Sequence, residues 1–321
     1  MRARLVAIFL IRRALALLVL LLLISFLVFG LLYLAPGNAI QVLLGTHPAS
    51  PGVIAALTAK YHLGDSFFEQ YLLWLKGASH LNLGVSIQTG QTVTSLIGGR
   101  ISLTLFLGIY AFLISVLLGV PAGVVAAMRN RTVADRAIVG ISLLGVSVPA
   151  FVSGVFLLYL LAIDAGWFPI YGPGSGFVDE LWHLTLPAFA LAFGVMALIV
   201  KLTRAAMVTV LEQDYIAFAH ARGVSPVRVI IRHALRNALG PVVTAGGLIL
   251  GVVLTGAVLV EQVFALPGIG SLLISAVGTK DVPVVQGFTL LAAAILIGAN
   301  FLIDLCYLFI DPRMTTGRGA T

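Results

Sequence analysis

Charged residues are scarce in this sequence: Asp, Glu, Lys and Arg make up only 10% of its 321 residues. Hydrophobic residues make up 60%, the mean hydropathy is +1.11, and apolar runs long enough to cross a bilayer recur along the chain. These features exclude an ordinary soluble domain and make the lipid bilayer the first expected partner. The net charge of +7 is not gathered on one face of a polar domain, so nucleic acid is not expected as a partner.

Cysteine, lysine and catalytic motifs are also scarce or absent. Cys306 is the only cysteine, so an intrachain disulfide is excluded. No HExxH, GxSxG or Cys/His pair at metal-ligand spacing occurs, so neither an intramembrane enzyme nor a metal site is expected. None of the four lysines follows a glycine, as the lysine of a phosphate-binding loop does. Any ATP and magnesium are therefore expected on partner subunits, with no cofactor in this chain.

The sequence predicts an all-α integral membrane protein with six spans. Their expected ranges are Ala14–Tyr33, Ile101–Met128, Ala137–Ile163, Leu184 to about Lys201, Pro241–Val260 and about Val284–Leu308. The middles of these spans lack ionisable side chains. Carriers driven by protons or sodium usually keep such side chains there, although each costs about 2.5–3.5 kcal/mol to insert. A proton-coupled carrier is therefore the weaker alternative.

Proline and glycine mark two of these spans. Pro149 is expected to bend the third span, because proline cannot donate a backbone hydrogen bond. The fifth span contains Gly246, Gly247, Gly251 and Gly256. Gly247 and Gly251 form a small-xxx-small pair, which lets a neighbouring helix approach closely. These positions serve either helix packing or the lining of a translocation path.

Lysine and arginine fall mostly on one side of the predicted spans. With the N-terminus inside, only Lys60, Lys76, Arg100 and Lys280 lie outside, so both termini are predicted to be cytoplasmic. The long first apolar run favours an uncleaved span over a signal peptide. The predicted organisation is a cytoplasmic N-terminus and first span at 1–33, an extracytoplasmic segment at 34–99, a core at 100–310 with a cytoplasmic loop at 201–240, and a cytoplasmic tail at 311–321.

The outer segment is too long for a bare loop. Pro51 can begin a helix that runs to about Tyr61, and Asp65 can cap a second one that ends near Trp74. Four aromatic residues are interpreted as interfacial rather than as a ligand cage. They are Trp74, Trp167, Tyr171 and Trp182.

One long basic segment, Phe218–Pro241, contains four arginines, two histidines and no acidic residue. A helical pattern runs from Thr203 to Ala221, and Gly223 fits the left-handed position after a helix. Ser225 and Pro226 are then suited to the N-cap and first residue of a second helix.

The second helix is predicted to carry an apolar stripe and a basic side. The stripe consists of Val227, Ile230, Ile231, Ala234, Leu235 and Ala238, while Arg228, Arg232 and Arg236 lie elsewhere on the helix. Anionic lipid headgroups would account for the charge. A turn that fixes the angle between two cytoplasmic helices favours the alternative, a docking surface for another protein.

This segment resembles the EAA loop of ATP-binding-cassette importer permeases. Aligned on Gly223, Ala217, Phe218 and Ala219 occupy the Glu-Ala-Ala positions. The stretch DYIAFAHARGVSPVRVIIRHALRNALGPVVT is similar to the version in dipeptide, oligopeptide and nickel permeases. Other similar segments follow in the family's order: LLYLAPGNA, QYLLWL, NLGVSI, ISLTLFLG, GVPAGVVAAMRN, VSVPAFVSG, WFPIYG, HLTLPAFALAF, VEQVFALPGIGSLL, DVPVVQG and DPR.

The resemblance implies a type I importer-like permease fold in the bacterial plasma membrane, with a helical extracytoplasmic segment between the first two spans. The implied partners are a second permease subunit, two ATPases that bind ATP and magnesium, and an extracytoplasmic peptide-binding protein. The outer segment either lies near that protein or caps the spans. The implied substrates are oligopeptides or dipeptides, with nickel as the alternative.

The resemblance also assigns ATPase coupling to residues of the basic segment. They are Asp214, Tyr215, Ala217, Phe218, Ala219, Ala221, Arg222, Gly223, Ser225, Pro226, Arg228, Arg232, His233 and Arg236. The acidic residue of the general pattern is missing from the Glu-Ala-Ala positions. Asp214, Arg222 and Arg228 are alternatives for the side chain that contacts the ATPase.

Overall fold

The computed structural model of the chain describes residues 2–34, 50–60 and 64–310. Within these ranges the regular structure is helical, apart from one isolated antiparallel bridge between Val85 and Thr92, which confirms the all-α prediction. The start of the outer segment, 35–49, and the predicted tail, 311–321, lie outside the described residues. The chain divides into two compact units: Met1–Ser102 with Gly268–Phe301, and Leu103–Pro267 with Leu302–Thr321.

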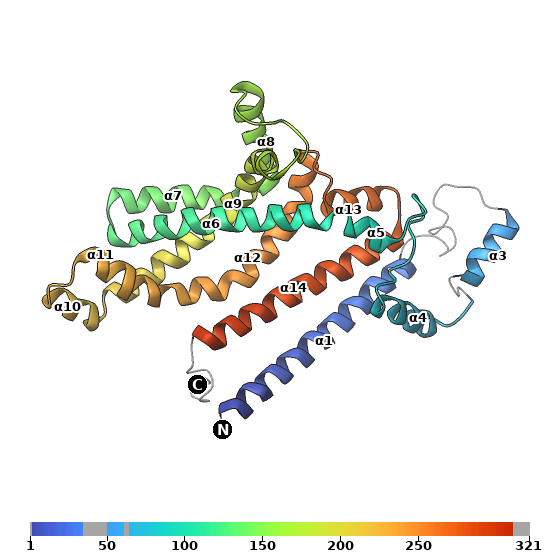
Figure 1. Cartoon of the computed structure of the whole chain (residues 1–321), viewed down its shortest axis with the longest axis horizontal. Helices are drawn as coiled ribbons and strands as arrows, with labels where there is room; N and C mark the ends of the chain where they lie inside the picture. Colours follow the sequence, from blue (N-terminus) through green and yellow to red (C-terminus); the bar gives the residue numbers. More distant parts are fainter. Residues whose placement is uncertain (1, 35–49, 61–63, 311–321) are drawn as a thin grey trace. The chain divides into compact units, whose positions relative to one another are not determined.

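The first unit combines long apolar helices with short helices of the outer segment (Figure 1). Its elements are α1 (Arg2–Leu34), α3 (Pro51–Lys60), α4 (Phe67–Ser79), α5 (Val93–Gly98), α13 (Ile269–Gly278) and most of α14 (Val282–Ile310). Aromatic rings join α1 to α4: the centroid of Phe26 lies 5.5 Å from Phe67 and 5.3 Å from Tyr71. The Ser25 and Tyr71 hydroxyl oxygens are 2.8 Å apart. Part of the outer segment is therefore packed on the first span.

The helices predicted in the outer segment are present, but the second begins at a different cap. Ser66, not Asp65, is the N-cap of α4, because its hydroxyl accepts the Glu69 N–H while Glu69 accepts the Ser66 N–H. This reciprocal capping box satisfies two N–H groups that the first helical turn leaves unpaired. The Asp65 carbonyl instead accepts a hydrogen bond from the Gln70 side chain.

A buried carboxylate fixes the rest of the outer segment to the turn between α13 and α14. Asp281 is only 3% exposed and accepts hydrogen bonds from the Ser86 hydroxyl at 2.5 Å and the Ile87 N–H at 3.2 Å. Val93, which is fully buried, lies in one apolar cluster with Leu272 of α13. These contacts join segments that are far apart in the sequence, and they make the outer segment an integral part of the first unit.

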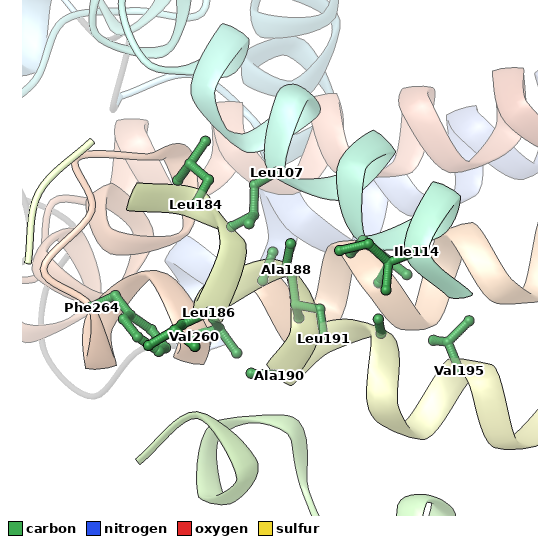
Figure 2. Packing of buried hydrophobic residues seen from close by; sticks show 14 of the residues in the cluster. Leu107, Ile114, Leu184, Leu186, Ala188, Ala190, Leu191, Val195, Val260 and Phe264 are labelled. Carbon is green, nitrogen blue, oxygen red and sulfur yellow. The ribbon is translucent and has the colours of Figure 1, made fainter. Parts of the chain in front are cut away.

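The second unit is built around α9 (Phe177–Leu211). Its other elements are α6 (Ile101–Met128, except its first two residues), α7 (Val133–Ser147), α8 (Ala150–Leu157), η1 (Leu158–Asp164), α10 (Asp214–Ala221), α11 (Pro226–Arg228), η2 (Val229–Leu235) and α12 (Arg236–Val263). Figure 2 shows Leu107 and Ile114 of α6 and Val260 and Phe264 around α9 residues such as Leu191. Of the apolar window of α9, 61% is buried, compared with 17% of the apolar window of α1. We conclude that α9 is the central helix of this unit.

Four of the described helices are long and apolar enough to cross a membrane, and a bent pair makes a fifth candidate. The four candidates are Leu10–Gly30, Val93–Met128, Phe177–Leu211 and Val282–Phe301. The predicted second span, Ile101–Met128, coincides with α6. The apolar part assigned to α12, Gly251–Val263, is shorter than a span. The total of six therefore stays a prediction.

The predicted third span, Ala137–Ile163, is not a single helix. The chain bends by 104° between α7 and the α8–η1 pair, at Pro149. Val148 is extended there, with φ −97° and ψ 121°, and Pro149 is the N-cap of α8. A residue before proline avoids the helical conformation and proline lacks an N–H, so the helix ends here. Pro149 bends the segment as predicted, and the bend is sharp enough to separate two helices.

Candidate functional site

The predicted helical hairpin is present and has a break that the sequence did not predict. We call Gln213–Arg236 the basic hairpin. The helix predicted over Thr203–Ala221 is interrupted, because α9 ends at Leu211 and α10 begins after an N-cap at Gln213. The second arm begins at Pro226 and continues through α11 and η2 into α12 without a gap. The hairpin is thus continuous with α12 and separated from α9 by a short turn.

The turn of the hairpin has the predicted conformation. Gly223 has a φ of +74°, its N–H donates to the His220 carbonyl at 2.9 Å, and the Val224 N–H donates to the Ala219 carbonyl at 3.1 Å. A Cβ at Gly223 would meet nothing within 4 Å, so its backbone conformation, not space, favours glycine. Pro226 is the first residue of the next helix as predicted, whereas the Ser225 side chain makes no capping hydrogen bond.

A small apolar cluster fixes the hairpin to the rest of the second unit. Ile216 of α10 and Val229 of η2 are buried together with Met207 of α9 and Ala127 of α6. The Asn237 side chain adds a polar link by donating to the Tyr215 hydroxyl at 3.1 Å. Both arms therefore pack near the C-terminal ends of α6 and α9, and the hairpin is a fixed part of this unit.

The predicted apolar stripe of the second arm is confirmed in part: Ala234 and Ala238 are buried, and Ile230 and Leu235 pack against the same cluster. Val227 and Ile231 are 65% and 61% exposed, whereas Val229 and Ala234 are fully buried. The reason is that Val229–Leu235 forms a π-helix, in which a turn contains about one residue more than in an α-helix. The buried positions are therefore five residues apart.

The hairpin presents both basic and large apolar side chains on its surface. Phe218, Val227 and Ile231 are 69%, 65% and 61% exposed, and Tyr215 is 42% exposed. The other exposed residues among the predicted coupling positions are Asp214, Ala217, Ala221, Arg222, Gly223, Ser225, Pro226, Arg228, Arg232 and Arg236, whereas Ala219 and His233 are half-buried. Large apolar side chains exposed among arginines are typical of protein-binding surfaces.

Arg204 and Asp135 form an ion pair that the sequence did not reveal. The Arg204 Nε donates to one oxygen of the 3%-exposed Asp135 at 2.5 Å, and its Nη2 donates to the other oxygen at 2.7 Å. Nη2 also donates to the Asn130 side chain at 3.0 Å. The pair links the first turn of α7 to α9, about two turns before α9 ends at Leu211. Because the partners are 69 residues apart, no local pattern predicts it.

The proposed glycines of the fifth span are only partly described. Gly246 and Gly247 lie in α12, but their surroundings are outside the described part of the chain. Gly251 is half-exposed. A Cβ at Gly256 would lie 3.1 Å from the Leu191 side chain of α9. That contact favours the helix-packing interpretation for Gly256.

The closest described approaches to α9 are made by other glycines. A Cβ at Gly123 of α6 would lie 2.7 Å from Thr203 Cβ and 2.9 Å from the Val200 carbonyl oxygen, both on α9. A Cβ at Gly145 of α7 would lie 2.7 Å from the Phe193 carbonyl oxygen of α9. Together with Gly119, Gly123 forms a small-xxx-small pair on α6. This pair is visible in the sequence, although the pair predicted there was Gly247 and Gly251 of the fifth span.

A second carboxylate is buried near the end of the predicted fifth span. Glu261 of α12 is fully buried and accepts a hydrogen bond from the Thr104 hydroxyl of α6 at 2.5 Å. The described residues contain no group of three or more His, Cys, Asp or Glu side chains that could hold a metal ion.

Two family models together match most of the chain. Residues 119–316 match the binding-protein-dependent transport system inner membrane component family, and residues 6–108 match the N-terminal model of the same membrane component. The chain therefore belongs to this family of importer permeases. It is a multi-pass inner-membrane permease subunit of an ATP-binding-cassette importer.

Similar proteins are peptide permeases in several bacteria. The dipeptide transport system permease protein DppB of Escherichia coli strain K12 is 36% identical over 317 residues, which cover 91% of this chain and 94% of that protein. The DppB of Bacillus subtilis strain 168 is 37% identical, with 95% and 97% covered. A di/tripeptide permease of Pseudomonas aeruginosa is 36% identical, with 91% and 94% covered.

The fold is similar to that of a solved importer. A chain of the MetNI methionine ABC transporter, solved in an inward-facing conformation, aligns with a TM-score of 0.56 at 17% identity. The alignment covers 67% of this chain and 96% of that chain. At this identity the likeness concerns the fold, which is that of a type I importer permease.

Proposed function

We propose that this chain is one of two membrane-spanning subunits of an ATP-driven peptide importer and forms half of its translocation path. The peptide permeases at 36–37% identity over more than nine-tenths of the chain support this substrate class. The sequence has no glycine-lysine pair for a phosphate-binding loop. ATP and magnesium are therefore bound by partner ATPases, and this chain is the non-catalytic subunit. The remaining partners are a second permease and an extracytoplasmic peptide-binding protein.

The basic hairpin is the docking site for an ATPase. One observation carries this proposal: buried side chains anchor the hairpin to the second unit, whereas other large apolar side chains of the hairpin are exposed. Ile216 and Val229 anchor it in a buried cluster, whereas Phe218, Val227 and Ile231 are more than 60% exposed. A lipid-anchoring helix would need its apolar side chains at headgroup depth, but it would not need the fixed turn at Gly223.

Docking at this position couples ATP binding to the spans. The second arm of the hairpin is continuous with α12, and its buried cluster includes Met207 of α9. Movement of the hairpin by closing ATPases therefore acts on two long helices at once. Differential binding of the ATPases to two arrangements of these helices is sufficient to switch access to the path.

The orientation follows from the charge distribution. Arg129, Arg131 and Arg136 lie at the turn between α6 and α7, near the end of α9 that leads to the basic hairpin. The positive-inside rule places this end in the cytoplasm, together with both termini. The outer segment, 34–99, then faces the binding protein.

The test is to co-express the chain with its partner permease, ATPases and binding protein, and to measure peptide uptake and ATP hydrolysis in proteoliposomes. Proline has a φ near −65° and cannot adopt the +74° of Gly223. Gly223→Pro should therefore abolish uptake and weaken ATPase co-purification, while membrane insertion persists. Gly240→Ala is the matched control, because its Cβ would meet nothing within 4 Å in a helix. Wild-type uptake by Gly223→Pro would contradict the proposal.

The substrate and the energy source are tested in the same liposomes. Competition of labelled dipeptide uptake by longer peptides and by Ni²⁺ distinguishes the peptide classes from the nickel alternative. Uptake that persists with ATP after the proton gradient is collapsed supports the importer. Uptake that stops with the gradient would instead support a proton-coupled carrier.

A further inference from the structure

The π-helix η2 lies in the middle of an otherwise continuous helical run, between the turn of the basic hairpin and α12. A π-helix of this length is rare, and such segments are frequent at functional sites. Neither proline nor glycine occurs within Val229–Leu235, so no residue of the segment forces the wide turns. These wide turns lie between the turn of the hairpin and α12, and they add about one residue to the helical path compared with an α-helix.

The sequence of this arm also fits the ordinary α-helical register. Counted back from the buried Ala234 in α-helical steps, the inward positions would be Ile230 or Ile231 and then Val227, all of them apolar. In the structure Val229 is fully buried and Ile230 packs against the same cluster, while Val227 and Ile231 are exposed. Each register therefore offers the buried cluster apolar side chains of similar size, and neither brings a charged residue into it.

A polar tie accompanies the π register. The Asn237 side-chain nitrogen donates to the His233 carbonyl at 2.9 Å and to the Tyr215 hydroxyl at 3.1 Å. His233 lies inside η2, and Tyr215 lies in the first turn of α10. A side chain that supplies a donor inside a helical ladder favours local distortion of that ladder. The tie thus connects the wide turns to the other arm of the hairpin.

We propose that η2 is a register switch that regulates the docking surface, an inference that depends on the proposed ATPase coupling. With nucleotide-free ATPases the arm has the π register, and Val227 and Ile231 face the ATPase. ATP-driven closure converts η2 to an α-helix, which rotates the arm by about 100° relative to α12 and displaces it by about 1.5 Å. Val229 then leaves the cluster with Met207 and Ile216, and Val227 and Ile231 turn towards it.

The switch has a specific signature in cysteine accessibility. Because Cys306 is the only native cysteine, a Cys306→Ser background allows single cysteines at positions 227, 229 and 231. The full complex is labelled with a maleimide in lipid nanodiscs, without nucleotide and with an ATPase variant that binds ATP but cannot hydrolyse it. We expect the cysteine at 229 to be protected without nucleotide and to react at least about tenfold faster with ATP bound. The cysteine at 231 should change in the opposite direction. Val133→Cys, at an 81%-exposed position in the same unit, should not change.

Two variants test the two registers separately. Deletion of Ile231 leaves position 229 four residues before Ala234, so an α-helix already turns it inward and no change of register is possible. The cysteine at 229 should then stay protected in both nucleotide states, and ATP hydrolysis should continue without uptake. Asn237→Ala removes the tie and places a good helix former, alanine, at an exposed position. It should raise the reactivity at 229 several-fold without nucleotide. If the deletion variant does not assemble, Asn237→Ala still tests whether η2 can change its register.

The outcomes distinguish this inference from the function on which it depends. If no ATPase co-purifies with the chain, the docking proposal fails. If ATPases bind and ATP drives uptake while position 229 stays protected in both states, the hairpin moves as a rigid body and the register switch is refuted. Wild-type uptake by the Ile231 deletion would also refute it.

Discussion

The contact between α6 and α9 leaves no room for a side chain at Gly123, and this gives a quantitative prediction for Gly123→Ala. The added Cβ would lie 2.7 Å from Thr203 Cβ and 2.9 Å from the Val200 carbonyl oxygen. Because one of these atoms belongs to the α9 backbone, a rotamer change cannot relieve both contacts. The helices would have to separate, and overpacking of this kind costs about 1–3 kcal/mol.

Gly140→Ala provides the matched control. Gly140 lies on α7, is exposed, and would place its Cβ within 4 Å of nothing. In a helix this substitution should stabilise by about 0.5–1 kcal/mol. The same chemical change should therefore differ between the two sites by about 1.5–4 kcal/mol.

The measurement is unfolding in mixed micelles, followed by tryptophan fluorescence, for wild type and both variants. Gly123→Ala should unfold at a lower denaturant fraction than wild type, and Gly140→Ala at an equal or higher one. If the two variants unfold together, α6 and α9 do not approach as closely as the structure indicates, and the reasoning is refuted.

Three further predictions concern the hairpin and the outer segment. Phe218→Asp, at a 69%-exposed position, should leave the chain folded but reduce ATPase co-purification at least about tenfold; unchanged recovery would exclude Phe218 from the docking surface. Ser86→Ala removes a hydroxyl donor from buried Asp281 and should destabilise the first unit by about 1.5–3 kcal/mol, measured by protease resistance of that unit against wild type. Hydrogen bonds from the Ser66 N–H and hydroxyl hold the pKa of Glu69 below its ordinary value. The capping box should therefore stabilise α4 fully above that ordinary pKa and be lost as the pH falls through the lowered one. Amide hydrogen exchange in α4 should accelerate over this range, and Glu69→Gln, which removes the titrating group, should remove the dependence.

Local chemistry was sufficient to predict some parts of the molecule. The turn at Gly223 and the helix start at Pro226 follow from backbone preferences of single residues, and the structure confirms both. The span Ile101–Met128 follows from an uninterrupted apolar run. A bend at Pro149 was predicted, but not the separation into two helices or its angle, which depends on packing that the proline does not determine.

Features that depend on distant partners could not be predicted. The pairs Arg204–Asp135 and Thr104–Glu261 join residues that are 69 and 157 positions apart, and either side chain alone is compatible with a solvated position. The register of η2 was missed for a different reason. Its sequence is also compatible with α-helical spacing. Only the burial of Val229 in the cluster shows that the segment has π-helical spacing instead.

The close contacts of α9 with its neighbours also have a mechanical meaning. At 1.5 Å per residue, its 35 residues extend over about 52 Å. Backbone-to-backbone contacts at Gly123 and Gly145 deform little, so α6 and α7 move with α9 as one lever. A tilt of about 5° about the end of α9 next to the basic hairpin then displaces the opposite end by about 4–5 Å, comparable to the spacing between two hydrogen-bonded strands. A small change of angle beside the hairpin is thereby amplified along the length of α9.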